Sequence, residues 1–318
     1  MITQSEVGRL LRYATLAASS HNTQPWRFEA DGDCIRVFAD AGRQLLVADP
    51  DRRELFLSVG CAIENLVVAA EQLGHAATVS YEESDGGCES LIPVASVRLD
   101  PALCRPSREV AAMFRGIDRR HTPRGPFAAL PVPHALVQAA SIAADDLGTQ
   151  LVFVGDAQRK QAAAAVAAEG ERVQFAREDF RRELADLVGA GAFGTPRAYA
   201  WLAKAAVSHV DLGPRYAARA YEHVVGAPLL GFLLAEPGRA SLVRAGRAFE
   251  RVALLAAAEG FAVQPVSEPI QVPSLRAKLA ALVDAPADTL AMFFRLGGSR
   301  IAPVRRLPRR QADDAVVH

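Results

Sequence analysis

The segment from Asp51 to Gly74 constrains the fold most, because its sequence predicts a helix that is apolar on most of its faces. Asp51 and Glu54 are typical of a helix N-terminus, and Gly74 is typical of a helix end. A helix of this kind needs packing partners on several sides, so we expect it at the centre of the molecule. Its large apolar side chains are Leu55, Phe56, Val59, Ile63, Leu66 and Val67.

Shorter patterns around this helix predict an α+β unit that ends near residue 105. Thr3-Gln4-Ser5-Glu6 matches a capping box, and it opens a helix with an apolar stripe of Val7, Leu10, Leu11 and Ala14. Runs rich in β-branched residues predict strands near 34–38, 77–81 and 92–99.

Residues 106–318 predict a second unit with the same order of helix, strand, long helix and strand. Helices are expected near 107–115, from about Pro133 and over 240–259, and strands near 151–154, 229–234, 261–266 and 289–296. Sequence identity between the halves is faint. The repeated order nevertheless predicts two pseudo-repeats fused in one chain.

Residues 170–205 depart from this pattern. A charged helix is expected over 171–187, followed by Gly189-Ala190-Gly191-Ala192-Phe193-Gly194. This run fits G-x-G-x-x-G, but a dinucleotide site would follow a strand and open a helix, whereas this run follows a helix and leads into Pro196. A lid over a pocket and a plain surface excursion are equally compatible with it. Phe193 and Trp201 could line such a lid, although core packing is favoured for both.

The composition favours a small-molecule partner. Lys plus Arg equals Asp plus Glu, at 36 each, so no overall charge favours nucleic acid or a membrane surface. The N-terminus lacks the pattern of a signal peptide, and no apolar run approaches the roughly 20 residues that span a bilayer. We therefore expect a cytoplasmic protein.

Metal sites and the common hydrolase motifs are not predicted. The four cysteines (Cys34, Cys61, Cys88 and Cys104) are irregularly spaced, which fits neither zinc binding nor a disulfide framework. The seven histidines show no metal-ligand spacing, and no Gly-x-Ser-x-Gly or Walker-type sequence occurs.

The polar loop after the first helix reads Ser19-Ser20-His21-Asn22-Thr23-Gln24-Pro25-Trp26. Its hydroxyl and amide side chains can hydrogen-bond the edge of a heterocycle, while Pro25 fixes the backbone and Trp26 packs the loop down. A flat ligand with polar edges suits this set. A helix end followed by a turn, with Ser and Asn as caps, would have the same sequence.

This loop resembles the flavin-binding signature of the nitroreductase superfamily, Ser-Ser-x-Asn-x-Gln-Pro-Trp. Ala18 stands where the family commonly has Pro, but every hydrogen-bonding position is present. The resemblance implies that Ser19, Ser20, Asn22 and Gln24 bind FMN at the edge of its isoalloxazine ring.

Arg119-Arg120-His121-Thr122-Pro123-Arg124 resembles the Arg-x-Ser/Thr-x-Arg/Lys element of the same family. The resemblance implies that Arg120 and Thr122 bind the FMN phosphate, and that Arg124 lies near flavin N1 and O2. A cation there would stabilise the charge that builds as hydride arrives. A solvated basic loop is the alternative.

Two later segments extend the resemblance. Residues 260–269 are similar to the segment whose amides face flavin N5, which implies Val266, Ser267 and Glu268 as donors, because Pro265 and Pro269 lack an amide hydrogen. Leu307-Pro308-Arg309-Arg310 resembles the Pro-Arg-Arg that closes over the phosphate, which implies Arg309 and Arg310 as ligands. Arg305-Arg306 is a competing pair.

Nearly the whole chain thus resembles the fused, Acg-like branch of the superfamily. This implies a nitroreductase fold with halves 1–105 and 106–318, one FMN between them, one empty pseudo-site, and a monomer. NAD(P)H would reduce FMN, which would pass hydride from N5 to a nitroaromatic, a quinone or a similar acceptor, without a catalytic side chain. An FMN-sequestering protein with little turnover is the alternative, and a fold that has lost flavin is a third.

Overall fold

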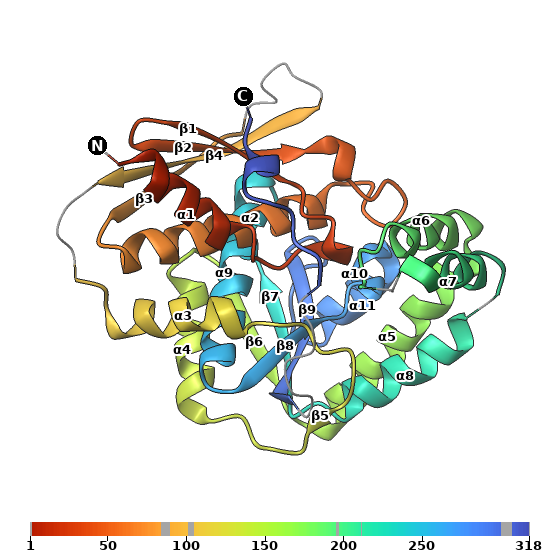
Figure 1. Ribbon diagram of the computed structural model, residues 1–318. Coiled ribbons are helices and arrows are strands. Elements are labelled where there is room, and N and C mark those ends of the chain that lie inside the picture. Colours follow the sequence, from red (N-terminus) through yellow and green to blue (C-terminus); the bar gives the residue numbers. More distant parts are fainter. Residues whose placement is uncertain are drawn as a thin grey trace.

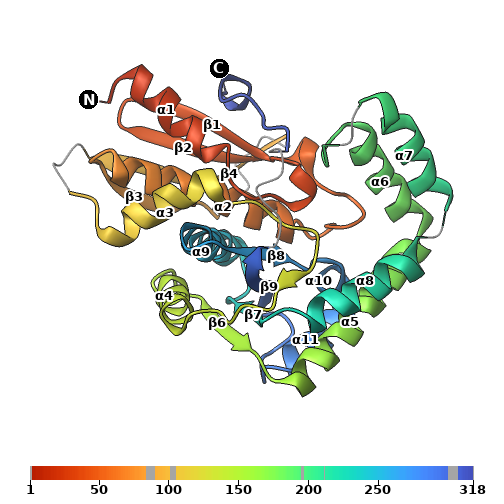
Figure 2. The same ribbon diagram turned by 60° about the horizontal axis from the view of Figure 1, so that its bottom comes forward.

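The structure is a computed structural model that describes residues 2–83, 90–100, 105–194, 197–210, 212–299 and 307–317, and it places two antiparallel sheets around two long helices (Figures 1 and 2). The α+β prediction is confirmed. The helices are α1 (Gln4–Ala14), α2 (Arg53–Gln72), α3 (Arg108–Arg119), α4 (His134–Asp145), α5 (Ala157–Ala176), α6 (Glu178–Gly189), α7 (Arg197–His209), α8 (Gly213–Val225), α9 (Arg239–Ala258), α10 (Glu268–Gln271) and α11 (Pro273–Ala281).

The first sheet has the strand order β1-β2-β4-β3, and the second has the order β5-β9-β7-β6 with β8 paired to β9. Every strand pair in both sheets is antiparallel. The strands are β1 (Trp26–Asp31), β2 (Cys34–Asp40), β3 (Ala76–Tyr81), β4 (Leu91–Asp100), β5 (Phe127–Ala128), β6 (Gln150–Val154), β7 (Leu229–Leu234), β8 (Phe261–Pro265) and β9 (Leu290–Ser299).

Helices α2 and α9 cross at the centre of the molecule, backbone against backbone. A Cβ on Gly246 would lie 2.0 Å from the carbonyl oxygen of Leu57, and a Cβ on Gly60 would lie 2.2 Å from that of Val243. Only glycine allows this approach. The two contacts are reciprocal, as expected for two related halves.

One helical turn beyond each of these glycines lies a fully buried glutamate, Glu64 on α2 and Glu250 on α9. Glu64 accepts hydrogen bonds from Arg247 and Arg251 of α9, and Glu250 forms an ion pair with Arg120. Each half therefore inserts one carboxylate into the contact between the halves. This internal symmetry agrees with the fused-repeat prediction.

The N-terminus of α2 differs from the prediction in its cap. The helix starts at Arg53, and the carboxylate of Asp49 accepts hydrogen bonds from the amides of Glu54 (3.0 Å) and Leu55 (2.9 Å). Arg52 adopts a left-handed backbone with φ 59° just before the helix. Asp49, not Asp51, is thus the capping residue.

The single helix predicted over 171–187 is wrong. Helices α5 and α6 meet at Arg177, which has an extended backbone (φ −82°, ψ 124°). Phe175 and Phe180, on either side of this break, pack together in a small separate core with Leu45 and Ala48. The packing of these two phenylalanines therefore determines where the chain breaks between α5 and α6.

Sequence patterns also missed β1 and helices α7 and α8. Trp26 is fully buried at the start of β1 rather than in a loop. Helices α6 and α7 pack together at one side of the molecule, where α7 exposes Tyr199, Trp201 and Leu202 (Figure 2). The core position favoured for Trp201 is wrong.

The C-terminal segment returns to the first sheet. Val316 forms a parallel bridge with Phe28, and the Val317 amide donates to the Phe28 carbonyl (2.8 Å). Cys34 and Cys61 are free thiols, whereas Cys88 and Cys104 lie outside the described residues. In the described parts of the chain, every helix is too short or too polar to cross a membrane.

Candidate functional site

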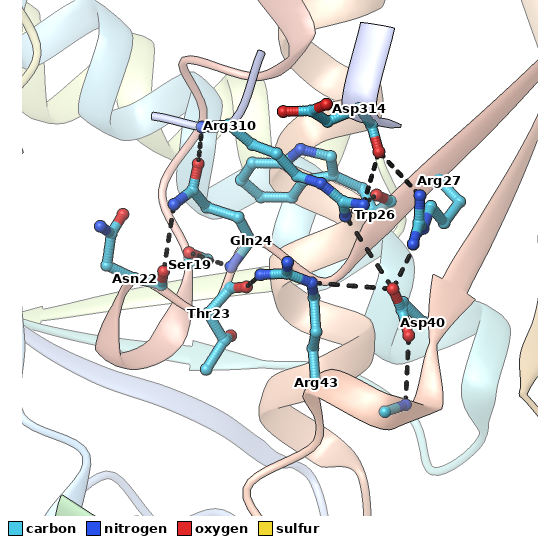
Figure 3. Close-up of polar contacts among 11 residues, drawn as sticks. Ser19, Asn22, Thr23, Gln24, Trp26, Arg27, Asp40, Arg43, Arg310 and Asp314 are labelled. Atoms are coloured by element: carbon cyan, nitrogen blue, oxygen red, sulfur yellow. Dashed lines mark hydrogen bonds and ion pairs between the residues drawn. The ribbon is translucent and has the colours of Figure 1, made fainter. Parts of the chain in front are cut away.

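The loop between α1 and β1 is a tight turn with an unusual backbone. His21, Asn22 and Gln24 have left-handed φ values of 48°, 59° and 51°. A left-handed backbone costs a residue other than glycine about 1–3 kcal/mol, and such residues cluster at functional sites. The Ser19 hydroxyl accepts a hydrogen bond from the Gln24 amide (3.1 Å), and buried Trp26 anchors the end of the loop (Figure 3).

Residues 308–310 lie against this loop, although the sequence separates them by more than 280 positions. The Pro308 carbonyl accepts from the amide groups of Asn22 (3.1 Å) and Gln24 (3.3 Å). Arg309 donates to Oδ1 of Asn22 (3.0 Å), and the Arg310 amide donates to Oε1 of Gln24 (2.7 Å; Figure 3). The structure therefore brings together the two ends of the chain that the resemblance assigned to one site.

The Arg310 side chain is held by its own surroundings. Its guanidinium donates to the carbonyl oxygens of Trp26 (3.4 Å) and Asp314 (2.5 Å) and lies 3.9 Å from the Asp40 carboxylate. Burial, together with the neighbouring Arg43 and Arg27, lowers the pKa of Arg310 to about 10. Arg310 thus fixes the C-terminal segment, while Arg309 faces the loop. The competing pair Arg305-Arg306 lies outside the described residues.

Arg120 lies beneath the entrance to the loop. Its side chain is 7% exposed, with Nε 3.1 Å from Oε1 of Glu250 and Nη2 donating to the Leu16 carbonyl (3.1 Å). Oε2 of Glu250 accepts from the Ala18 amide (3.3 Å). Burial raises the pKa of Glu250, while Arg120 and Arg309 act in the opposite direction. The Glu250 carboxylate therefore connects Arg120 to the start of the loop at Ala18.

The other members of the Arg element face outward. Thr122 is exposed, and the Arg124 guanidinium lies 4.4 Å from the centre of the Phe193 ring. Burial of this guanidinium lowers the pKa of Arg124, with Tyr216 and Glu268 acting against that shift. Arg124 forms no ion pair with a described residue.

The turn after α6 covers the loop. The Ala192 carbonyl accepts from the Asn22 side chain (3.0 Å), and the Phe193 ring lies 6.0 Å from the His21 ring in an edge-to-face arrangement. Phe193 thus lies between His21 and Arg124 and outside the main core. The glycine run around it follows a helix, as predicted, which disfavours a dinucleotide fingerprint.

In the segment 266–268, the Val266 amide donates to the Phe293 carbonyl (2.9 Å), so Val266 is not free to donate to a ligand. Ser267 and Glu268 remain. Gly170 lets α5 approach this segment closely, since a Cβ there would lie 2.7 Å from the Pro269 nitrogen. Burial raises the pKa of Glu268, and burial together with Glu268 raises the pKa of Glu171 to about 9.

A buried polar network behind Ser20 was missed by sequence reasoning. The Ser20 hydroxyl donates to the Glu54 carboxylate, which also accepts from Gln271 (3.1 Å), and Gln174 donates to Gln271 (2.7 Å). A charged residue inside a largely apolar helical pattern was the available signal for Glu250, whereas Glu54 was interpreted only as part of a helix N-terminus. No described group of His, Cys, Asp and Glu side chains could hold a metal ion.

The sequence of this chain is similar to those of known proteins along nearly its whole length. No known protein-family profile matches the chain. Two proteins of Mycobacterium tuberculosis align along it: the "Putative NAD(P)H nitroreductase Rv3131", with 28% identity over 98% of this chain and 90% of the relative, and the "Putative NAD(P)H nitroreductase acg", with 26% identity over 99% and 96%. The chain is therefore similar over nearly its whole length to proteins named as NAD(P)H nitroreductases, acg among them. The resemblance predicted from the loop at 19–26 is therefore confirmed.

Solved nitroreductases share less with this chain. The FMN and NADPH-dependent nitroreductase NfnB of a Sphingopyxis strain has 24% identity, 62% coverage of this chain and 95% of its own, with a TM-score of 0.43. NfnB of Mycobacterium smegmatis, solved in complex with NADPH, has 18% identity, coverages of 60% and 88%, and a TM-score of 0.39.

Proposed function

We propose that this protein is an FMN-dependent NAD(P)H oxidoreductase of the nitroreductase type. The observation that carries the proposal is the meeting of the loop at 19–24 with Arg309 and Arg310, because these segments come from opposite ends of the chain. The names of the relatives over nearly the full length support the same chemistry.

The donor set fits FMN. Arg309 donates to Asn22 of the loop, Arg120 is ion-paired with Glu250 at the loop entrance, and guanidinium groups are suited to a dianionic phosphate. Asn22 and Gln24 carry amide donors and acceptors of the kind that a ring edge needs, and here these groups pair with residues 192 and 308–310. Ser19 and Ser20 carry hydroxyl groups. Thr122, Ser267 and Glu268 complete the proposed set.

Bound FMN would supply the redox chemistry by accepting a hydride from NAD(P)H and passing it to a nitroaromatic, a quinone or a similar acceptor. The chain's own residues orient the cofactor and provide charge. Arg124, which forms no ion pair with a described residue, would stabilise negative charge on the ring. We assign no acid or base role to a side chain.

The overall organisation belongs to this proposal. We infer halves at 1–105 and 106–318, a lid within 170–205, and one complete site per chain, so that a monomer suffices. We also infer a cytoplasmic location. Light scattering of the purified protein tests the monomer directly, since a dimer would double the mass.

One observation favours an FMN-sequestering protein as the second candidate. Ala192 and Phe193 contact three residues of the site, namely Asn22, His21 and Arg124. A lid that stays in this position would keep nicotinamide from the flavin face. The two candidates differ only in whether the lid opens.

The deciding experiment is an anaerobic visible spectrum of the FMN-loaded protein during addition of NADPH and then NADH. Loss of the flavin band, followed by its return when a quinone or a nitroaromatic is added, is the result we expect. A band that persists in wild type but bleaches in Phe193→Ala supports sequestration. Persistence in both proteins contradicts the oxidoreductase proposal.

A further inference from the structure

Arg295 is a buried cation in the middle of the second sheet. It lies on β9 between Gln264 of β8 and Leu230 of β7, and it is 1% exposed. Few positions in a protein are less favourable for a charge, because a guanidinium there has lost its water.

Among the residues that the structure describes, the partners of Arg295 are neutral. Nη1 donates to the His223 carbonyl (2.9 Å), and Nη2 donates to the Gly125 carbonyl (3.2 Å) and to Oε1 of Gln264. The guanidinium also lies 4.7 Å from the centre of the Phe127 ring. Burial lowers the pKa of Arg295 to about 10, so the group remains protonated near neutral pH.

Two other buried arginines of the described chain have a carboxylate partner, which Arg295 lacks. Arg247 is paired with Glu64 at 2.7 Å, and Arg120 is paired with Glu250 at 3.1 Å. Arg295 forms no ion pair with any described residue. Buried charges are ordinarily paired, since an unpaired one costs several kcal/mol.

The neutral partners of Arg295 belong to the segments of the proposed flavin site. Gly125 directly follows Arg124, and Gln264 lies three positions before Ser267. Its guanidinium therefore hydrogen-bonds two of the segments that the proposed function assigns to the flavin. With FMN bound between these segments, the unneutralised positive charge would act through the protein interior on negative charge that develops on the ring.

We propose that Arg295 is a positioning residue whose unpaired charge favours the reduced form of bound FMN. The inference rests on the proposed function. Reduction adds two electrons and one proton to FMN and gives the anionic hydroquinone FMNH⁻, with the hydride of NAD(P)H as the source. The product carries one more negative charge than FMN, so a nearby cation stabilises it more than it stabilises the oxidised form.

The test is the midpoint potential of bound FMN, measured by equilibration with a reference dye, together with FMN affinity. In Arg295→Gln, the affinity for reduced FMN should fall at least about tenfold relative to that for oxidised FMN, which lowers the potential by about 30 mV. Arg295→Lys keeps the charge, so its affinity ratio should stay within about threefold of wild type. Arg36→Gln, an exposed charge on β2, is the control and should change nothing.

Gln264→Glu provides a second test if Arg295→Gln fails to fold. It keeps an oxygen acceptor for the guanidinium but adds a counter-charge, so we expect the same loss of at least about tenfold. Unchanged potentials in the folded variants overturn the role of Arg295 while leaving the proposed function intact. A wild-type protein that binds no FMN overturns the proposed function and this inference with it.

Discussion

Replacing Glu64 by Gln should destabilise the junction between the two halves strongly. Glu64 is fully buried and accepts from Nε of Arg247 (2.7 Å) and Nε of Arg251 (2.5 Å), while Arg247 also donates to the Tyr81 hydroxyl (2.7 Å). Glutamine would leave the Arg247 guanidinium without a counter-charge and would leave Arg251 with the more distant Asp146 carboxylate (3.9 Å) alone. Breaking a buried ion pair from one side costs about 3–5 kcal/mol, which is the loss we expect.

The loss should depend on pH with a defined sign. Burial alone would raise the pKa of Glu64, but Arg247 and Arg251 outweigh burial and hold it below its usual value of 4.5. The stabilisation is therefore complete above about pH 4.5 and disappears as pH falls through the lowered pKa of the folded state. The difference between wild type and Glu64→Gln should be constant from pH 6 to 8 and shrink in acid.

Urea unfolding followed by circular dichroism measures the effect. The matched control is Glu29→Gln, which breaks an ion pair of similar length, 2.6 Å to Arg36, in which the side chains are 34% and 54% exposed. We expect a change below about 1 kcal/mol there. A loss below about 1 kcal/mol in Glu64→Gln would refute the reasoning, because burial would then make no difference.

Three further predictions concern packing, proton linkage and the lid. Gly246→Ala should lower the free energy of unfolding by about 3 kcal/mol or more in a thermal melt, because its Cβ would lie 2.0 Å from the Leu57 carbonyl oxygen. Gly8→Ala is the control and should raise the free energy of unfolding by about 0.5–1 kcal/mol, because Gly8 lies in α1 with open space around it. Equal effects of the two substitutions would contradict the close crossing of α2 and α9. Burial and the neighbouring Glu54 raise the pKa of Asp49 to about 7. The wild-type protein should therefore lose stability relative to Asp49→Asn as pH rises from about 4 to 7. A constant difference between the urea midpoints of the two proteins over this pH range would argue against the shift. Phe193→Ala should speed reduction of bound FMN by NADPH severalfold in stopped-flow absorbance, and an unchanged rate would show that Phe193 does not limit access.

Strongly periodic elements could be predicted from sequence, and elements fixed by long-range packing could not. The capping box at Thr3 and the long apolar helices around Gly60 and Gly246 carry their signals locally. The break at Arg177 has no local signal, because it depends on Phe175 and Phe180 reaching the core of Leu45 and Ala48.

The candidate site shows the same division. The loop at 19–24 was predicted because its residues form one contiguous pattern, and its resemblance also pointed to Arg309 and Arg310. The pairing of Arg120 with Glu250 and the surroundings of Arg295 depend on residues that are distant in the sequence, such as Gly125, which lies 170 positions from Arg295, so no local pattern encodes them. The strand β1 was missed because Trp26 was interpreted only as the anchor of the loop.

The most direct test of the central claim is the amount of FMN bound per chain, measured by visible absorbance and by release of the cofactor after gel filtration. The account predicts one FMN per wild-type chain, unchanged binding in the control Arg36→Ala, and at least about tenfold weaker binding in Asn22→Ala/Arg309→Ala. A folded wild-type protein that takes up no FMN would contradict the account, as would full occupancy in the double variant.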